Sequence, residues 1–216
     1  MTAPLSIPAG VSLDGAGHTI SLVGDAAAFE SAAVRVTAGE VTDLTIDGSR
    51  LDATAPEWFA AITLSAPGRI TQVTVANLQF SGARSVIGIE VAAFAGQAAA
   101  LDAVTLVNIA GAGVLACGDG AVTVRDLNAC DVTAAIQLNG AVSATVSGLS
   151  VELSGVALAA LDHTRVRLLD EEPAALAVLD QARVRQDKLT FIAAPLREAD
   201  VSASAGEELP EAGARV

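Results

Sequence analysis

Val73-Thr74-Val75-Ala76-Asn77 is the stretch that decides the fold, because its pattern returns four more times along the chain. In each copy two apolar residues flank a threonine, which is the period-two pattern of a strand with one buried face. Three residues after each threonine stands a glycine, an asparagine or an aspartate, the types that enter the left-handed backbone region most readily. The pairs are Thr45 and Gly48, Thr74 and Asn77, Thr105 and Asn108, Thr123 and Asp126, and Thr145 and Gly148.

A second series of short apolar segments lies between these strands. Its members are Val34-Arg35-Val36, Ile62-Thr63-Leu64, Ile87-Gly88-Ile89, Val114-Leu115, Ile136-Gln137-Leu138, Val156-Ala157-Leu158 and Leu176-Ala177-Val178. Two or three short strands per turn of roughly 20 residues are typical of a parallel β-solenoid, in which each rung buries its inward side chains against its neighbours. The repeats therefore predict an all-β chain of about seven to eight rungs.

A family resemblance rests on Ile7-Pro8-Ala9-Gly10-Val11-Ser12-Leu13-Asp14-Gly15-Ala16-Gly17-His18-Thr19-Ile20. This stretch resembles the start of right-handed parallel β-helix proteins of the pectin-lyase-like superfamily, and with the later rungs the resemblance covers roughly residues 5 to 192. It implies a single right-handed parallel β-helix. The superfamily includes pectate lyases, polygalacturonases, alginate epimerases, phage tailspikes, adhesins and non-catalytic members, many of which contact polysaccharide along an elongated face. The motif is specific for the fold and does not specify an activity.

Composition is consistent with one solenoid domain. We expect a lead-in over residues 1–10, a β-helix over 11–192 and an extended tail over 193–216, whose Ser, Ala and Glu residues have little to bury. The chain is 52% hydrophobic but has no uninterrupted apolar run of the length that spans a membrane. With no secretory leader visible, we expect a cytoplasmic protein, one carried on a particle such as a virion, or one exported by a non-classical route.

Charge is distributed unevenly over the chain. The formal net charge of −13 argues against nucleic acid as a partner. Five of the arginines nevertheless fall in the central position of the strand repeat or the next outward position: Arg125, Arg165, Arg167, Arg183 and Arg185. We expect them on one face, where they would bind an anionic sugar, a phosphate or an acidic partner. The alternative is that Asp170, Glu171, Glu172 and Asp187 neutralise them locally as surface ion pairs.

A long insertion after the first repeat is the second candidate binding element. It runs from Ser49 to Phe59 and contains the only tryptophan, Trp58. Loops on a rigid scaffold often carry binding groups. The indole could stack on a sugar ring while Arg50, Asp52 and Glu57 hydrogen-bond to its hydroxyl groups. Trp58 and Phe59 could equally contact a neighbouring subunit or cover the wall of the helix.

A catalytic constellation is not evident in the sequence. Hydrolases of this fold need clustered aspartates and lyases need a basic residue beside a neutralised carboxylate. The candidate acids are scattered singly over the repeats: Asp43, Asp47, Asp102, Asp126 and Asp131. The histidines, His18 and His163, are too far apart in the repeat series to cooperate. We therefore predict no catalytic residue, no cofactor and no metal site, and keep a polysaccharide lyase, hydrolase or epimerase as the alternative.

Assembly is indicated by the ends of the predicted rod. Open solenoids expose strand edges that associate unless they are capped. Pro4 and Pro8 exclude an amphipathic cap helix before Val11, and the tail would need a partner to become ordered. The sequence thus favours a homo-oligomer, trimeric or end-to-end, and a non-enzymatic subunit of a spike, fibre or surface assembly that contacts cell-surface polysaccharide.

Overall fold

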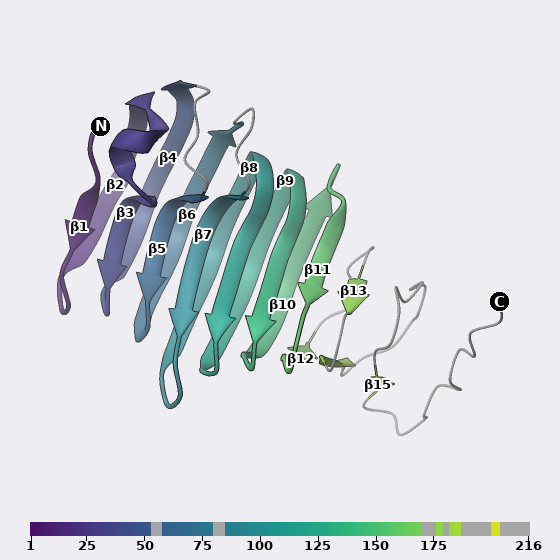
Figure 1. The fold of residues 1–216 in the computed structure, drawn as a ribbon. Coiled ribbons are helices and arrows are strands. Elements are labelled where there is room, and N and C mark those ends of the chain that lie inside the picture. Colours follow the sequence, from purple (N-terminus) through teal and green to yellow (C-terminus); the bar gives the residue numbers. More distant parts are fainter. Residues whose placement is uncertain (53–57, 80–84, 170–175, 179–181, 187–199, 204–216) are drawn as a thin grey trace.

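The chain is a parallel β-solenoid of about six turns, seen in a computed structural model (Figure 1). The structure describes residues 1–52, 58–79, 85–169, 176–178, 182–186 and 200–203. Seven or eight rungs were expected from the repeats, and the last of these fall where the described residues are interrupted. Within the described segments the only helical element is a short 3-10 turn, η1 (Ala26–Phe29).

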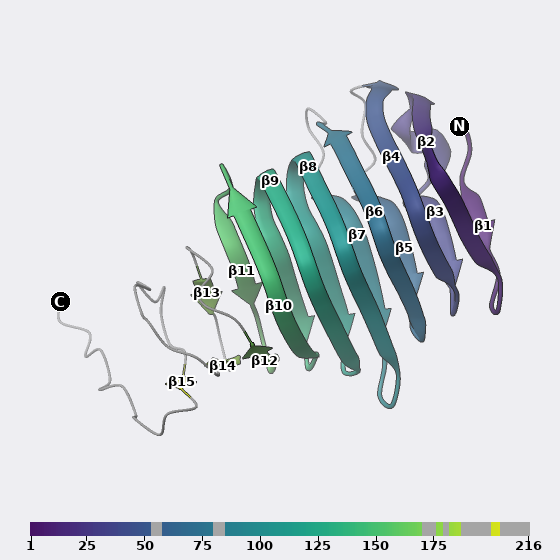
Figure 2. The same cartoon turned by 180° about the vertical axis from the view of Figure 1, so that it is seen from behind.

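In the described residues, fifteen strands form one continuous parallel sheet that coils around the core. They are β1 (Leu5–Ile7), β2 (Ser12–Asp25), β3 (Ala32–Thr37), β4 (Glu40–Asp52), β5 (Trp58–Ser65), β6 (Gly68–Leu78), β7 (Ser85–Ala93), β8 (Ala98–Gly118), β9 (Ala121–Gly140), β10 (Ser143–Glu152), β11 (Val156–Ala160), β12 (Arg165–Leu168), β13 (Leu176–Val178), β14 (Arg183–Gln186) and β15 (Asp200–Ala203). Figures 1 and 2 show β3, β5 and β7 on one side of the coil and β2, β4 and β6 on the other.

Each turn has three faces. The first bend joins the first face to the second, and the second bend joins the second face to the third. The first face consists of residues 12–14, 40–42, 69–71, 100–102, 123–125 and 145–147 and continues into β12 and β14. The second face consists of residues 18–21, 44–47, 73–76, 104–107, 127–130 and 149–152. The third face is formed by β1, β3, β5, β7, the later parts of β8 and β9, β11 and β13.

Left-handed residues produce both bends. The first bend has positive φ at Asp43, Gln72, Ala103, Asp126 and Gly148, and the second has it at Asn77, Asn108, Asp131 and Leu153. Positive φ is uncommon outside glycine, with asparagine and aspartate the usual exceptions. The repeated bend that the sequence predicts is therefore present, but it is not the only one. Left-handed residues also lie where the third face passes into the first face of the next turn, at Ala38, Gly96, Gly118, Gly140 and Asp162.

The register corrects the predicted column of five threonines. Thr45, Thr74 and Thr105 are neighbours on the second face, but the strand beyond Thr105 places Asn128 beside it. Thr123 and Thr145 are neighbours on the first face. The alignment was wrong because both faces carry the same apolar–polar–apolar pattern, so the motif moves to the other face between β8 and β9. On the third face Ile62 pairs with Ile89 rather than Ile87; Ile87 pairs with Ala60 and packs with it and Leu115 in a small cluster separate from the main core.

Gly48 also departs from the prediction. Its φ is not positive; a Cβ at this position would lie 2.6 Å from Leu78 Cδ2 and 2.7 Å from the Asn77 carbonyl oxygen. This glycine is needed because the next turn packs directly against it. Glycine serves close approach of this kind as well as left-handed turns.

Both ends of the predicted domain contain strands. Within the lead-in, β1 pairs with β3, and the Met1 amine donates to the Ser21 carbonyl oxygen at 2.7 Å. Within the tail, β15 pairs with β14 of the same chain. Between these ends, inward Val, Ile and Leu side chains form one continuous core, in which Phe29 and Phe59 meet edge to face at 6.3 Å.

Candidate functional site

Arginines of consecutive strands line up on the first face. In β12, Val166 and Leu168 are 3% and 4% exposed, whereas Arg165 and Arg167 are exposed. The alternation shows that the arginines face outward. The register places Arg183 of β14 beside Arg165, and Arg185 beside Arg167. The backbone thus arranges these four positions as a two-by-two grid, which we call the arginine array.

Strand geometry fixes the spacing of the arginine array. Neighbouring strands lie about 4.8 Å apart, and alternate residues along a strand about 6.7 Å apart. Like charges directly opposite each other on neighbouring strands disfavour folding. Such an arrangement suits an anionic ligand with repeated charges, because a guanidinium offers paired N–H donors to carboxylate, sulfate or phosphate oxygens. On the far side of β14, Asp200 of β15 occupies the position beside Arg183.

Arg125, the fifth predicted arginine, lies on the same face outside this array. It is exposed on β9, with Asp102 of β8 beside it in register on one side and Ser147 of β10 on the other. All five predicted arginine positions therefore share one face. Like Arg183, Arg125 has an aspartate beside it in register.

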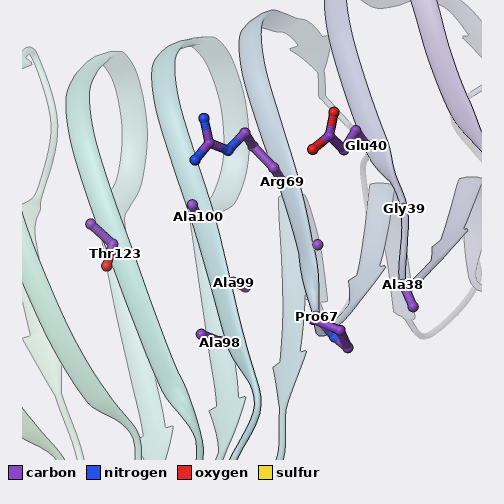
Figure 3. A pocket seen from close by; sticks show the side chains of 10 residues that line it. Ala38, Gly39, Glu40, Pro67, Arg69, Ala98, Ala99, Ala100 and Thr123 are labelled. Carbon is purple, nitrogen blue, oxygen red and sulfur yellow. The ribbon is translucent and has the colours of Figure 1, made fainter. Parts of the chain in front are cut away.

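A shallow hollow of about 430 Å³ lies on the part of this face that spans β4 to β9 (Figure 3). Its floor and margins are made of small residues with two charged side chains and one hydroxyl group. The lining residues are Ala38, Gly39, Glu40, Pro67, Gly68, Arg69, Ala98, Ala99, Ala100 and Thr123. Figure 3 shows the Arg69 guanidinium extending over β8 above Ala100, on the side away from Glu40.

Sequence reasoning missed Glu40 and Arg69. They are exposed and adjacent in register, and the column they begin continues through Ala100, Thr123 and Thr145 to Arg167. This column is visible only with the correct register, because the predicted alignment places Thr123 on the second face. The sequence did contain a signal, since both residues directly precede an inward apolar residue, as Arg167 does.

Beside the hollow, a four-residue connection joins β7 to β8 and extends beyond the neighbouring turns (Figure 2). The Gln97 backbone N–H donates to the Phe94 carbonyl oxygen at 2.8 Å, and the Phe94 N–H donates to Gln97 Oε1 at 3.2 Å. The Ala121 N–H donates to the Gln97 carbonyl oxygen at 2.9 Å. These bonds fix the loop onto β9. They leave the Phe94 side chain 58% exposed at its tip.

The predicted cluster around Trp58 is not assembled among the described residues. Trp58 begins β5 on the third face, is 37% exposed, and donates from Nε1 to Glu90 Oε2 at 3.2 Å. Arg50 and Asp52 belong to the end of β4, where they pair with Val23 and Asp25. Glu57 lies outside the described residues.

Stacked polar side chains follow the second bend. Asn77 Nδ2 donates to Asp47 Oδ1 at 2.9 Å, Asn108 Nδ2 donates to Asn77 Oδ1 at 2.9 Å, and Gln79 Nε2 donates to Asn108 Oδ1 at 2.7 Å. The hydrogen bond from Asn77, followed by that from Ser49, lowers the pKa of the Asp47 carboxyl. We call this chain the amide ladder. It ties three successive turns together and is an internal structural element.

The candidate acids lie at three kinds of position in the coil. Asp43 and Asp126 lie in the first bend, Asp47 and Asp131 at the second, and Asp102 on the first face. In the parts of the chain that the structure describes, no three His, Cys, Asp or Glu side chains are grouped to hold a metal ion. The same parts contain no helix that is long and apolar enough to cross a bilayer.

Comparison with known proteins adds no relative. Neither a protein-family model nor a curated protein nor a solved structure matches the chain. The functional argument therefore depends on the geometry of this molecule.

Proposed function

We propose that this protein is a non-catalytic structural and binding subunit of the pectin-lyase-like type, part of a spike, fibre or surface assembly, and that its first face binds acidic polysaccharide. The observation that supports this proposal is the arginine array. A repeating polymer of anionic sugars presents its charges at regular intervals, and the register places the arginine positions of the array at regular intervals as well. An extended ligand lying along the coil axis meets one strand after another.

The electrostatics of the rest of the chain support this assignment. With a net charge of −13, the protein as a whole repels polyanions, so retention of one must come from a local concentration of positive charge. Bidentate hydrogen bonds from arginine to carboxylate or sulfate supply that local attraction. Because Arg165 and Arg167 are exposed, we expect binding to weaken steeply as salt is added.

The test is the binding of defined polysaccharides to the full chain at low and physiological ionic strength. Polygalacturonate, alginate and a sulfated glycan serve as acidic probes, and dextran serves as the neutral control. Arg165→Ser combined with Arg167→Ser should weaken retention of the acidic probe about tenfold or more. Arg50→Ser removes one exposed charge at the end of β4, away from the array, and should change retention less than twofold.

Two results would overturn the proposal. One is equal retention of acidic polymers by the wild type and the double variant. The other is shortening of the polymer during incubation, with new reducing ends or unsaturated products, because a non-catalytic module leaves its ligand intact.

A further inference from the structure

The Phe94 loop has a hydrogen-bonded backbone and carries an exposed aromatic side chain. Its three hydrogen bonds involve both ends of the loop and the start of β9. A Cβ on Gly120 would lie 2.5 Å from the Phe94 carbonyl oxygen, so the following turn packs closely under the loop. An exposed aromatic residue on a rigid support loses little conformational freedom when it is buried, and aromatic residues are typical anchors of protein interfaces.

The hollow begins one residue after this loop, at Ala98. Phe94 does not line it, so the ring does not fill the space beside it. The floor of Ala98, Ala99 and Gly68 has no side chain beyond a methyl group, which leaves room for a ring from another molecule. An exposed aromatic residue in the β7–β8 connection and a recess that begins directly after this connection are therefore neighbours along the chain.

Glu40 and Arg69 give the hollow a charge pattern that complements itself. They are adjacent in register and exposed, yet no ion pair joins these two described residues. Arg69 extends toward β8 instead (Figure 3). If a second copy faces the hollow across a two-fold axis, Glu40 of each copy meets Arg69 of the other, since a two-fold interface brings the same pair together twice.

We propose that this protein forms a side-by-side dimer with a second copy, in which Phe94 of each copy enters the hollow of the other and Glu40 and Arg69 pair reciprocally. Adjacent complementary features on one surface are the arrangement that a self-complementary interface requires. The arginine array lies outside this contact, because β10 separates β9, the last strand of the hollow, from β12. The proposal does not depend on the polysaccharide function.

Sedimentation velocity over a concentration series of the full chain tests the proposal. The wild type should show a reversible monomer–dimer equilibrium. Phe94→Ser should raise the dimer dissociation constant about 10- to 100-fold, because a buried phenylalanine ring is lost from both halves of the contact. Ala98→Trp, which fills the exposed floor, should have a similar effect. Leu153→Ser is the matched control, since Leu153 is 85% exposed and belongs to the second bend; it should leave the constant within twofold.

Charge reversal gives the more specific result. Arg69→Glu alone should weaken the dimer, because the new carboxylate at position 69 of each copy then faces the Glu40 carboxylate of the other copy. Combining it with Glu40→Arg should restore association to within a few fold of the wild type. Unchanged circular dichroism and thermal midpoints confirm that each variant is folded.

Three outcomes would overturn the proposal. The first is a wild type that stays monomeric at millimolar concentration. The second is a dimer that is insensitive to Phe94→Ser and Ala98→Trp, or a double charge reversal that fails to rescue Arg69→Glu. In the third, Phe94→Ser and Arg69→Glu reduce retention of acidic polysaccharide but leave self-association unchanged, which would assign the hollow to the glycan.

Discussion

Asn77 is the residue whose replacement tests the account of the amide ladder most directly. Its side chain donates to Asp47 and accepts from Asn108, both at 2.9 Å, while its backbone has a φ of 61°. Replacement by alanine removes both hydrogen bonds and leaves an unfavourable left-handed residue. It thus combines two separable effects.

The expected loss of stability follows from these contacts. A hydrogen bond to a charged carboxylate contributes about 1.5–3 kcal/mol, and one between neutral groups about 0.5–1.5 kcal/mol. We use the lower values because Asn77 and Asp47 are only half-buried. A left-handed alanine adds about 1 kcal/mol. Asn77→Ala should therefore lower the free energy of unfolding by about 3 kcal/mol.

A second variant separates the backbone effect from the hydrogen bonds. Asn77→Gly also removes both hydrogen bonds, but glycine adopts positive φ freely. The greater freedom of its unfolded chain lowers the free energy of unfolding by about 0.5–1 kcal/mol. It should be up to about 0.5 kcal/mol more stable than Asn77→Ala. Asn128→Ala is the control, because Asn128 is exposed on the second face outside the ladder, and it should stay within about 0.5 kcal/mol of the wild type.

Equilibrium unfolding in urea, followed by circular dichroism, measures these differences. An Asn77→Ala protein within about 1 kcal/mol of the wild type would refute the energetic role of the ladder. An Asn77→Gly protein less stable than Asn77→Ala would refute the role of the left-handed backbone. The two results are independent.

Three further predictions concern neighbouring residues. The pKa of Asp47 is lowered in the folded protein. The stabilising effect of this carboxylate is therefore complete above the unfolded pKa of 3.8 and is lost as the pH falls through the lower folded pKa. As the pH is lowered, the free energy of unfolding should decline less steeply for Asp47→Asn than for the wild type. Thr71 Oγ1 is buried without a hydrogen-bond partner among the described residues, so Thr71→Val should raise the urea midpoint, by up to about 1 kcal/mol in stability. Gly48→Ala should lower the free energy of unfolding by about 1–3 kcal/mol, and with it the thermal midpoint, because the alanine Cβ would overlap Leu78 and the Asn77 carbonyl. An unchanged midpoint would show that the turns move apart easily.

The architecture could be predicted from the sequence because it depends on short-range patterns. Alternating residues such as Val73-Thr74-Val75 define strands, and asparagines such as Asn77 mark bends, so repetition of both is sufficient to indicate a solenoid. The register of the strands was harder to predict. Thr105 and Thr123 have almost identical surroundings in sequence. Thr105 nevertheless lies on the second face, whereas Thr123 lies on the first face.

The candidate site depends on that register, which is why only part of it could be predicted. Arg165 and Arg183 were found because they are separated by one regular turn. Glu40 and Arg69 were missed because the longer early turns hide their common column. The hollow exists where alanines and glycines of different turns coincide, and such residues carry little signal individually. Only the extra length of the Phe94 connection could have been noticed in advance.

Because each face continues from turn to turn along the coil axis, the number of turns sets the distance between two elements on that face. The hollow ends at β9 and the arginine array begins at β12, with β10 alone between them. Their separation is thus a whole number of strand spacings of about 4.8 Å. Inserting or deleting one complete turn would change the distance between the two elements by one such step and leave the internal geometry of each intact. Variants of this chain with different numbers of turns would carry the two elements at different, discrete separations.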